Sequence, residues 1–145
     1  MKRIVLAFAA MIVSVGLFAQ EATVKKAENV IKFKELTHDF GKIKQGAPVS
    51  FDFAFTNVSE KPVVIESAVG SCGCTTPVKP EAPVAKGKND KITAGFNAAA
   101  AGPFNKTITV KVAGIESPME LRITGEVLTA DDYAKYTKEK ATKKG

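Results

Sequence analysis

Residues 49–55 read Val49-Ser50-Phe51-Asp52-Phe53-Ala54-Phe55. Large apolar side chains alternate with small or polar ones, and this two-residue period is typical of a β-strand with one buried face. We therefore predict a strand here that turns its valine and its three phenylalanines toward the protein core.

Similar short segments, rich in β-branched residues and separated by turn residues, lie on both sides of this strand. We expect them at residues 30–36, 40–43, 62–68, 92–96, 107–112 and 119–127. No segment has the period of an amphipathic helix long enough to connect parallel strands. The pattern predicts an all-β fold, an immunoglobulin-like antiparallel β-sandwich of about seven strands, without the tryptophan and long-range cysteine pair of antibody domains.

Three segments interrupt the strand pattern. Prolines at positions 77, 80 and 83 predict an extended surface loop from Thr76 to Lys91 rather than a regular element. Gly102-Pro103 is expected to interrupt the regular strand structure before the strand at 107–112. Near the C-terminal end, Thr129 with Asp132 three residues later resembles a capping box and predicts a short helix in a lysine-rich tail.

The first residues have the pattern of a secretory signal peptide. Lys2 and Arg3 precede an uncharged stretch, residues 4–18, which is shorter than the roughly 20 apolar residues of a membrane span. We expect cleavage after Ala19, export to the periplasm or the cell exterior, and a mature chain without a transmembrane segment. The expected parts are a signal peptide (1–19), an N-terminal linker (20–29), a β-sandwich domain (30–128) and a basic C-terminal tail (129–145).

The charge of the chain argues against nucleic-acid binding. The formal net charge of +6 falls to about +4 when Lys2 and Arg3 leave with the signal peptide. Much of the remainder comes from the lysine-rich tail. A nucleic-acid surface needs clustered basic residues with stacking aromatics among them, whereas the mature chain has a single arginine, Arg122.

The two cysteines, Cys72 and Cys74, are the candidate functional site. A disulfide between them would close a ring of about three residues, which removes only about 1.6 kcal/mol of unfolded-chain entropy. Residues two apart in a strand are also near the widest spacing that a disulfide accepts, so the chain must bend, and Gly73 would permit that bend. These features favour a reversible thiol–disulfide role, while the absence of a neighbouring charge gives no reason for unusual reactivity.

Other roles for the pair stay open. The alternatives are an inert structural disulfide, a contact loop, and a copper site in which two thiolates bind Cu(I) with His38, the only histidine, as a further ligand. Zinc is less suited, because structural zinc sites use four Cys or His ligands and the chain has three. No catalytic set can be assembled around His38.

Several motifs together carry a family resemblance. They are His38-Asp39-Phe40-Gly41-Lys42-Ile43, Phe53-Ala54-Phe55-Thr56-Asn57, Pro62-Val63-Val64-Ile65 and Ser71-Cys72-Gly73-Cys74-Thr75-Thr76-Pro77. In this order and spacing, over about residues 32–114, they resemble the bacterial domain-of-unknown-function 1573 family. The resemblance implies an immunoglobulin-like sandwich on exported proteins and implies no biochemical activity. The chain departs from the family at Ala85-Lys86-Gly87, where Pro-Gly is usual.

These observations favour an exported binding or envelope-associated module over an enzyme. The expected partner is a protein or another component of the cell envelope. Thiol–disulfide redox chemistry or Cu(I) binding at Cys72 and Cys74 is the alternative function.

Overall fold

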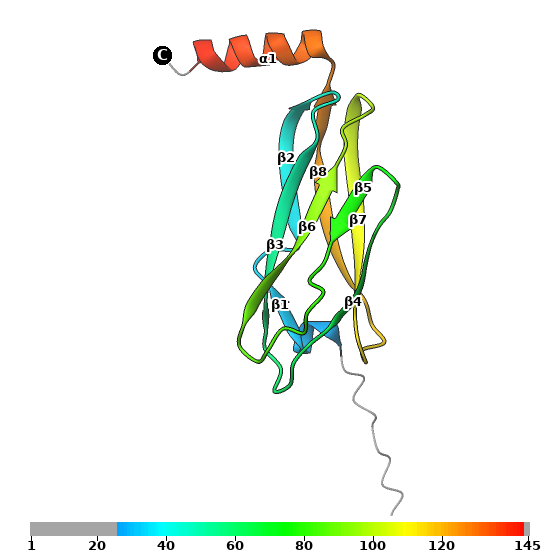
Figure 1. The fold of residues 1–145 in the computed structure, drawn as a ribbon. Helices are drawn as coiled ribbons and strands as arrows, with labels where there is room; N and C mark the ends of the chain where they lie inside the picture. Colours follow the sequence, from blue (N-terminus) through cyan, green and yellow to red (C-terminus); the bar gives the residue numbers. More distant parts are fainter. Residues whose placement is uncertain (1–25, 144–145) are drawn as a thin grey trace, which may run out of the picture.

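The computed structural model describes residues 26–143, and the fold is a sandwich of two four-stranded β-sheets (Figure 1). The signal peptide expected at residues 1–19 and the first part of the expected linker lie outside the described residues. One sheet has the order β1 (Ile31–Phe33), β3 (Val49–Asn57), β6 (Asn89–Phe96), β5 (Thr75–Val78). The other has the order β2 (Thr37–Lys44), β8 (Met119–Leu128), β7 (Gly102–Val112), β4 (Ile65–Gly70). The expected all-β sandwich is confirmed.

The strand pairing is antiparallel except between β2 and β8, which run parallel from Thr37 opposite Arg122 to Lys44 opposite Leu128. This pair makes the second sheet a mixed one, a detail that alternation along a single strand does not reveal. The register of β2 shifts between Asp39 and Lys42.

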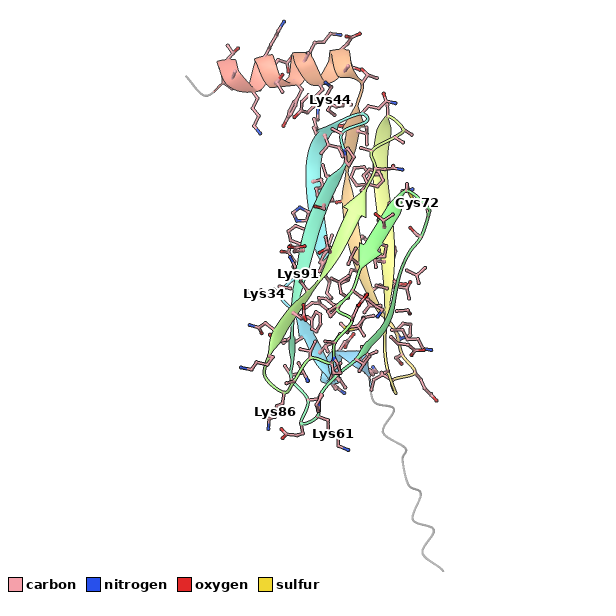
Figure 2. The ribbon with its side chains drawn as sticks, viewed as in Figure 1. Lys34, Lys44, Lys61, Cys72, Lys86 and Lys91 are labelled. Carbon is pink, nitrogen blue, oxygen red and sulfur yellow. A yellow bond between two sulfur atoms is a disulfide. The ribbon has the colours of Figure 1, made fainter. Side chains whose placement is uncertain are left out.

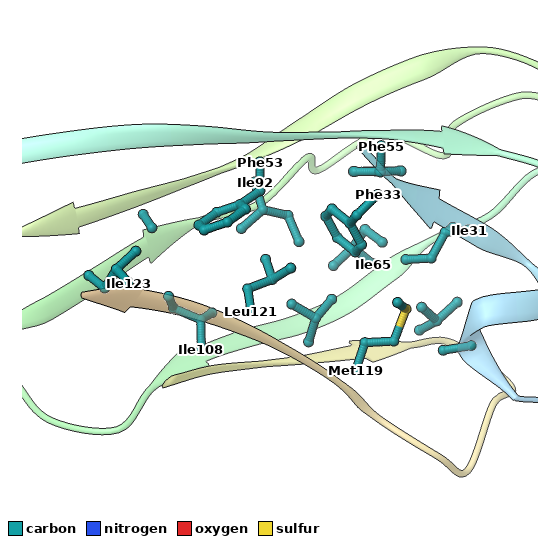
Figure 3. Close-up of a cluster of buried hydrophobic side chains, with 14 of the residues drawn as sticks. Ile31, Phe33, Phe53, Phe55, Ile65, Ile92, Ile108, Met119, Leu121 and Ile123 are labelled. Carbon is teal, nitrogen blue, oxygen red and sulfur yellow. The ribbon is translucent and has the colours of Figure 1, made fainter. Parts of the chain in front are cut away.

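The core lies between the two sheets and confirms the buried face of β3 (Figure 3). Phe53 and Phe55 are 0% and 1% exposed, and isoleucines, valines and a leucine of the opposite sheet pack around them. Val49 and Phe51, at the start of β3, are only half-buried and pack at the margin of the core. The alternation therefore predicts correctly which face of the strand is buried, although burial decreases toward the first residues of the strand.

Several expected strand boundaries are wrong: β1 ends at Phe33 rather than at residue 36, β2 begins at Thr37 rather than at residue 40, and β6 begins at Asn89 rather than at residue 92. The segment expected at 62–68 becomes a strand only from Ile65; before it, Val63 forms an isolated bridge with Val84. The break expected at Gly102-Pro103 does not occur, because β7 already begins at Gly102, which pairs with Val127 of β8.

The loop expected from Thr76 to Lys91 is also partly wrong. Its beginning belongs to the strand β5, which lies at the edge of its sheet and pairs only with β6. Pro77 is tolerated there because an edge strand has one side that needs no ladder hydrogen bonds. The residues between β5 and β6 remain largely irregular.

The two ends of the described chain carry the helical elements. A short 3-10 helix (Ala27–Asn29) precedes β1 and buries Ala27 in the core. The helix α1 (Ala130–Thr142) follows β8 and projects from one end of the sandwich (Figure 1). Its first turn is capped by Thr129, whose hydroxyl accepts a hydrogen bond from the backbone N–H of Asp132 at 3.3 Å. Within residues 26–143, no helix is long and apolar enough to cross a membrane.

Candidate functional site

The loop with the two cysteines joins β4 to β5 and so carries the chain from one sheet to the other (Figure 2). Backbone hydrogen bonds hold both of its ends. The N–H of Ser71 donates to the carbonyl of Thr107 on β7 at 2.8 Å, and the N–H of Asn97, just after β6, donates to the carbonyl of Cys74 at 3.1 Å. The loop is thus anchored to both sheets.

Cys72 and Cys74 form a disulfide, with their Cα atoms 5.2 Å apart. Both residues are half-buried, so part of each remains exposed to solvent. A hydrogen bond from the N–H of Thr75 to the carbonyl of Cys72, at 3.1 Å, closes the turn around Gly73. The pair is positioned where a molecule from solution can approach it.

The hydroxyl of Thr75 lies close to both sulfurs of the disulfide. Thr75 is 4% exposed, and its Oγ1 atom lies 3.6 Å from Sγ of Cys72 and 3.9 Å from Sγ of Cys74. Because disulfide sulfurs carry no hydrogen, the hydroxyl is the donor in both contacts. After reduction the same hydroxyl can donate to a thiolate, and a hydrogen bond to an ionised group is stronger than one to a neutral group.

The glycine that the loop requires is Gly70 rather than Gly73. A Cβ atom on Gly70 would lie 2.5 Å from the carbonyl oxygen of Thr75 and 2.9 Å from its Cβ atom. At Gly73, a Cβ atom would meet nothing within 4 Å, and the φ angle is not positive. The bend therefore does not require glycine at position 73, and the tight contact occurs where β4 and β5 approach each other at the base of the loop.

A pocket of about 190 Å³ opens beside the disulfide. Cys74 forms one part of its lining, and Lys106 of β7 forms another. The other walls come from Phe96, Phe104 and residues 97 and 99–103. Sequence reasoning missed this cation, because β7 follows the cysteines by a long stretch of chain and only the pairing of the strands brings Lys106 to the pocket.

His38 does not join the cysteines. It lies on β2, at one edge of its sheet, whereas the cysteines follow β4 at the opposite edge, with β8 and β7 between them. Strands about 4.8 Å apart place these two edges roughly 14 Å from each other. The imidazole instead stacks on the Phe51 ring, with centroids 3.6 Å apart. Within residues 26–143, no group of three or more His, Cys, Asp or Glu residues is arranged to hold a metal ion.

Comparisons with known proteins agree with this fold. A family model described as "Protein of unknown function (DUF1573)" matches residues 31–127. No curated protein matches the sequence.

Solved structures share the fold at low sequence identity. A protein of unknown function from Porphyromonas gingivalis W83 is 13% identical with a TM-score of 0.59, and the match covers 68% of this chain and 46% of that one. The VesB protease of Vibrio cholerae is 15% identical with a TM-score of 0.54, over 70% of this chain and 33% of that one. The PapD-like domain 7 of human CEP192 is 7% identical with a TM-score of 0.58, over 89% and 99%.

These likenesses establish a PapD-like, immunoglobulin-like sandwich. The first two matches span less than half of the other chains, so the activities of those proteins say nothing about this one. Since the family model covers two thirds of the sequence, the chain belongs to the DUF1573 family.

Proposed function

We propose that this member of the DUF1573 family is an exported binding module that contacts its partner through the Cys72–Cys74 loop. The observation that carries the proposal is a half-exposed disulfide, anchored to both sheets, with a pocket directly beside it. The signal-peptide pattern supports export to the periplasm or the cell exterior, where a disulfide persists. The partner is a protein or another envelope component.

We further propose, as a second function of the same loop, that the disulfide is reversible and exchanges with thiols. A ring of three residues stabilises the fold by only about 1.6 kcal/mol on the loop-entropy model, so stability is a weak reason to have this bond. The hydroxyl of Thr75, close to both sulfurs, can stabilise the thiolate that leaves when the bond opens.

Copper binding is the third candidate and rests on the reduced cysteine pair alone. Thiolates are soft ligands suited to Cu(I). Since His38 lies at the opposite edge of the sheet, it does not supply a further ligand. A Cu(I) titration of the reduced protein, followed by ultraviolet thiolate absorption, tests this candidate; an absence of binding by the pair removes it.

The deciding experiment measures the state of the cysteines and partner capture together. Protein prepared from its native compartment is alkylated before and after reduction and analysed by mass spectrometry. We expect an oxidised pair that dithiothreitol reduces without unfolding the protein. Capture of envelope components is then compared between the wild type and the Cys72→Ser/Cys74→Ser double variant.

The two functions predict different outcomes for that variant. If the loop binds by shape, the double variant still folds and retains capture. If the partner is held through thiol exchange, capture disappears while folding is preserved. A pair that is free and unreactive in the native protein contradicts thiol exchange, and a wild-type protein that captures nothing contradicts the binding module.

A further inference from the structure

The pocket beside Cys74 differs from an ordinary surface hollow in the size of its wall residues. The segment from Ala99 to Gly102 supplies only alanines and a glycine, and Phe96 and Phe104 stack behind it with ring centroids 4.2 Å apart. Its volume of about 190 Å³ has room for one or two small side chains. An occupant that presents small groups fits this volume.

Lys106 gives this small apolar pocket a positive charge. The residue is half-buried, and among residues 26–143 it forms no ion pair. An ammonium group next to apolar walls attracts an anion more strongly than one in open water, because the effective dielectric constant is lower. The pocket therefore suits a small anionic group that can also reach the sulfur of Cys74.

A cysteine thiolate in an extended peptide segment has these properties. It is small, it is anionic when it reacts, and it is the nucleophile that opens disulfides. Taking the reversible disulfide of the proposed function as given, we infer that the pocket receives a partner protein's cysteine, flanked by small residues. Lys106 holds its thiolate for attack on Cys74.

The positions of the two cysteines determine which sulfur is attacked. Cys74 lines the pocket, and its carbonyl is held by the N–H of Asn97. Cys72 lies at the outer corner of the loop (Figure 2) and has the shorter distance, 3.6 Å, to the hydroxyl of Thr75. Cys74 is thus the sulfur that receives the nucleophile, and Cys72 is the leaving group that Thr75 stabilises.

The exchange transfers a disulfide from this protein to its partner. The partner thiolate forms a bond to Sγ of Cys74, the Cys72–Cys74 bond breaks, and Cys72 leaves with the electron pair as a thiolate. A second thiol of the partner then attacks the first, closes a disulfide in the partner and releases Cys74 as a thiolate. The partner dithiol loses two electrons, the pair gains them, and the two thiol protons pass to Cys72 and Cys74.

The test uses the oxidised full-length mature protein and a blocked peptide, Gly-Ala-Cys-Ala-Gly, as the probe. The reaction is quenched with N-ethylmaleimide, which alkylates the sulfur released by the peptide, and mass spectrometry maps both adducts. We expect the peptide on Cys74 and the maleimide on Cys72. The reverse assignment overturns the inference.

The role of Lys106 is tested by the rate of this reaction. Lys106→Met should slow attack by the peptide about tenfold, the lower end of electrostatic effects on association, and Lys106→Arg should restore most of the rate. Lys111→Met on the same strand is the control, because Lys111 pairs with Glu66 at 3.3 Å and does not line the pocket. Equal rates for Lys106→Met and Lys111→Met refute the role of Lys106.

The role of the pocket is tested by filling it. Ala100 lines the pocket and is exposed, so Ala100→Leu is expected to fold. It should slow the peptide at least fivefold and leave reduction by dithiothreitol unchanged. If both reagents react with wild type and variant alike, the inference about the pocket is wrong while the reversible disulfide stands. If neither reagent opens the disulfide in the wild type, the proposed exchange function itself is wrong.

Discussion

Asn57, the last residue of β3, provides a sharp test of how the sandwich is held together. Its side chain is fully buried, with 0% exposure, and makes four hydrogen bonds. The Nδ2 atom donates to the carbonyls of Lys61 and Val84, each at 2.8 Å. The Oδ1 atom accepts from the backbone N–H and the hydroxyl of Ser59, also at 2.8 Å. One amide group thus fastens the turn after β3 to the segment before β6.

Replacement by alanine, Asn57→Ala, should destabilise the protein by about 3 kcal/mol. The carbonyls keep other donors, since that of Val84 also accepts from the N–H of Val63 and that of Lys61 from the hydroxyl of Ser59. The N–H of Ser59 loses the acceptor that Asn57 provides. The estimate comes from three hydrogen bonds at about 1 kcal/mol each. Other partners partly compensate for the loss of the fourth bond, and one donor is left without the acceptor that Asn57 provides.

The measurement is urea-induced unfolding followed by circular dichroism, with the disulfide kept oxidised. Thr56→Ala is the matched control, because the hydroxyl of the neighbouring residue donates to Oδ1 of Asn89 at 2.6 Å on the exposed side of the strand. We expect the control to lose at most about 1 kcal/mol. If the two variants lose the same free energy of unfolding, the buried amide does not have the role assigned to it here.

Three further predictions concern other parts of the chain. Gly70→Ala should lower the free energy of unfolding by about 2 kcal/mol, because the new methyl group would lie 2.5 Å from a backbone oxygen. Gly73→Ala should change the free energy of unfolding by less than about 0.5 kcal/mol, and similar urea midpoints for both variants would show that the loop is not tight at its base. Hydrogen bonds from the side chains of Lys91 and Thr93 hold the pKa of Asp52 below its usual value, so the ionised carboxylate stabilises the fold above about pH 4 and this stabilisation is lost as pH falls through the folded-state pKa. The stability difference between the wild type and Asp52→Asn should therefore vanish in acid. A carboxyl titration by NMR that finds an ordinary pKa for Asp52 contradicts this prediction. Deletion from Ala130 onward should shift the unfolding free energy by less than about 1 kcal/mol, because α1 has no buried residue, and a larger loss in thermal or urea unfolding would reveal a structural role for the helix.

Most of the fold could be predicted from the sequence, because which face of a strand is buried is a local property of that strand. The alternation at Phe53 and Phe55 follows from side chains that point to opposite faces of a strand, and it requires no knowledge of the partner strands. The errors arose where pairing overrides local preference. Pro77 was expected in a loop but lies in an edge strand, and Gly102 was expected at a break but begins a long strand paired with β8.

The candidate site, like the fold, could be predicted from the sequence only in part. Cys72 and Cys74 were found from the sequence, since their adjacency alone makes a pair possible. The neighbours of the pair could not be predicted, because only the order of the strands brings Lys106 to the same pocket as Cys74 and separates His38 from the pair.

By itself, the order of residues determined the strand-rich class, the family and the cysteine pair, all of which depend on short-range spacing. Only the tertiary structure decided which distant groups share the space around Cys74. The physical reason is that strand order and register are set by packing of the whole core, whose lowest free energy depends on contacts between residues far apart in the chain.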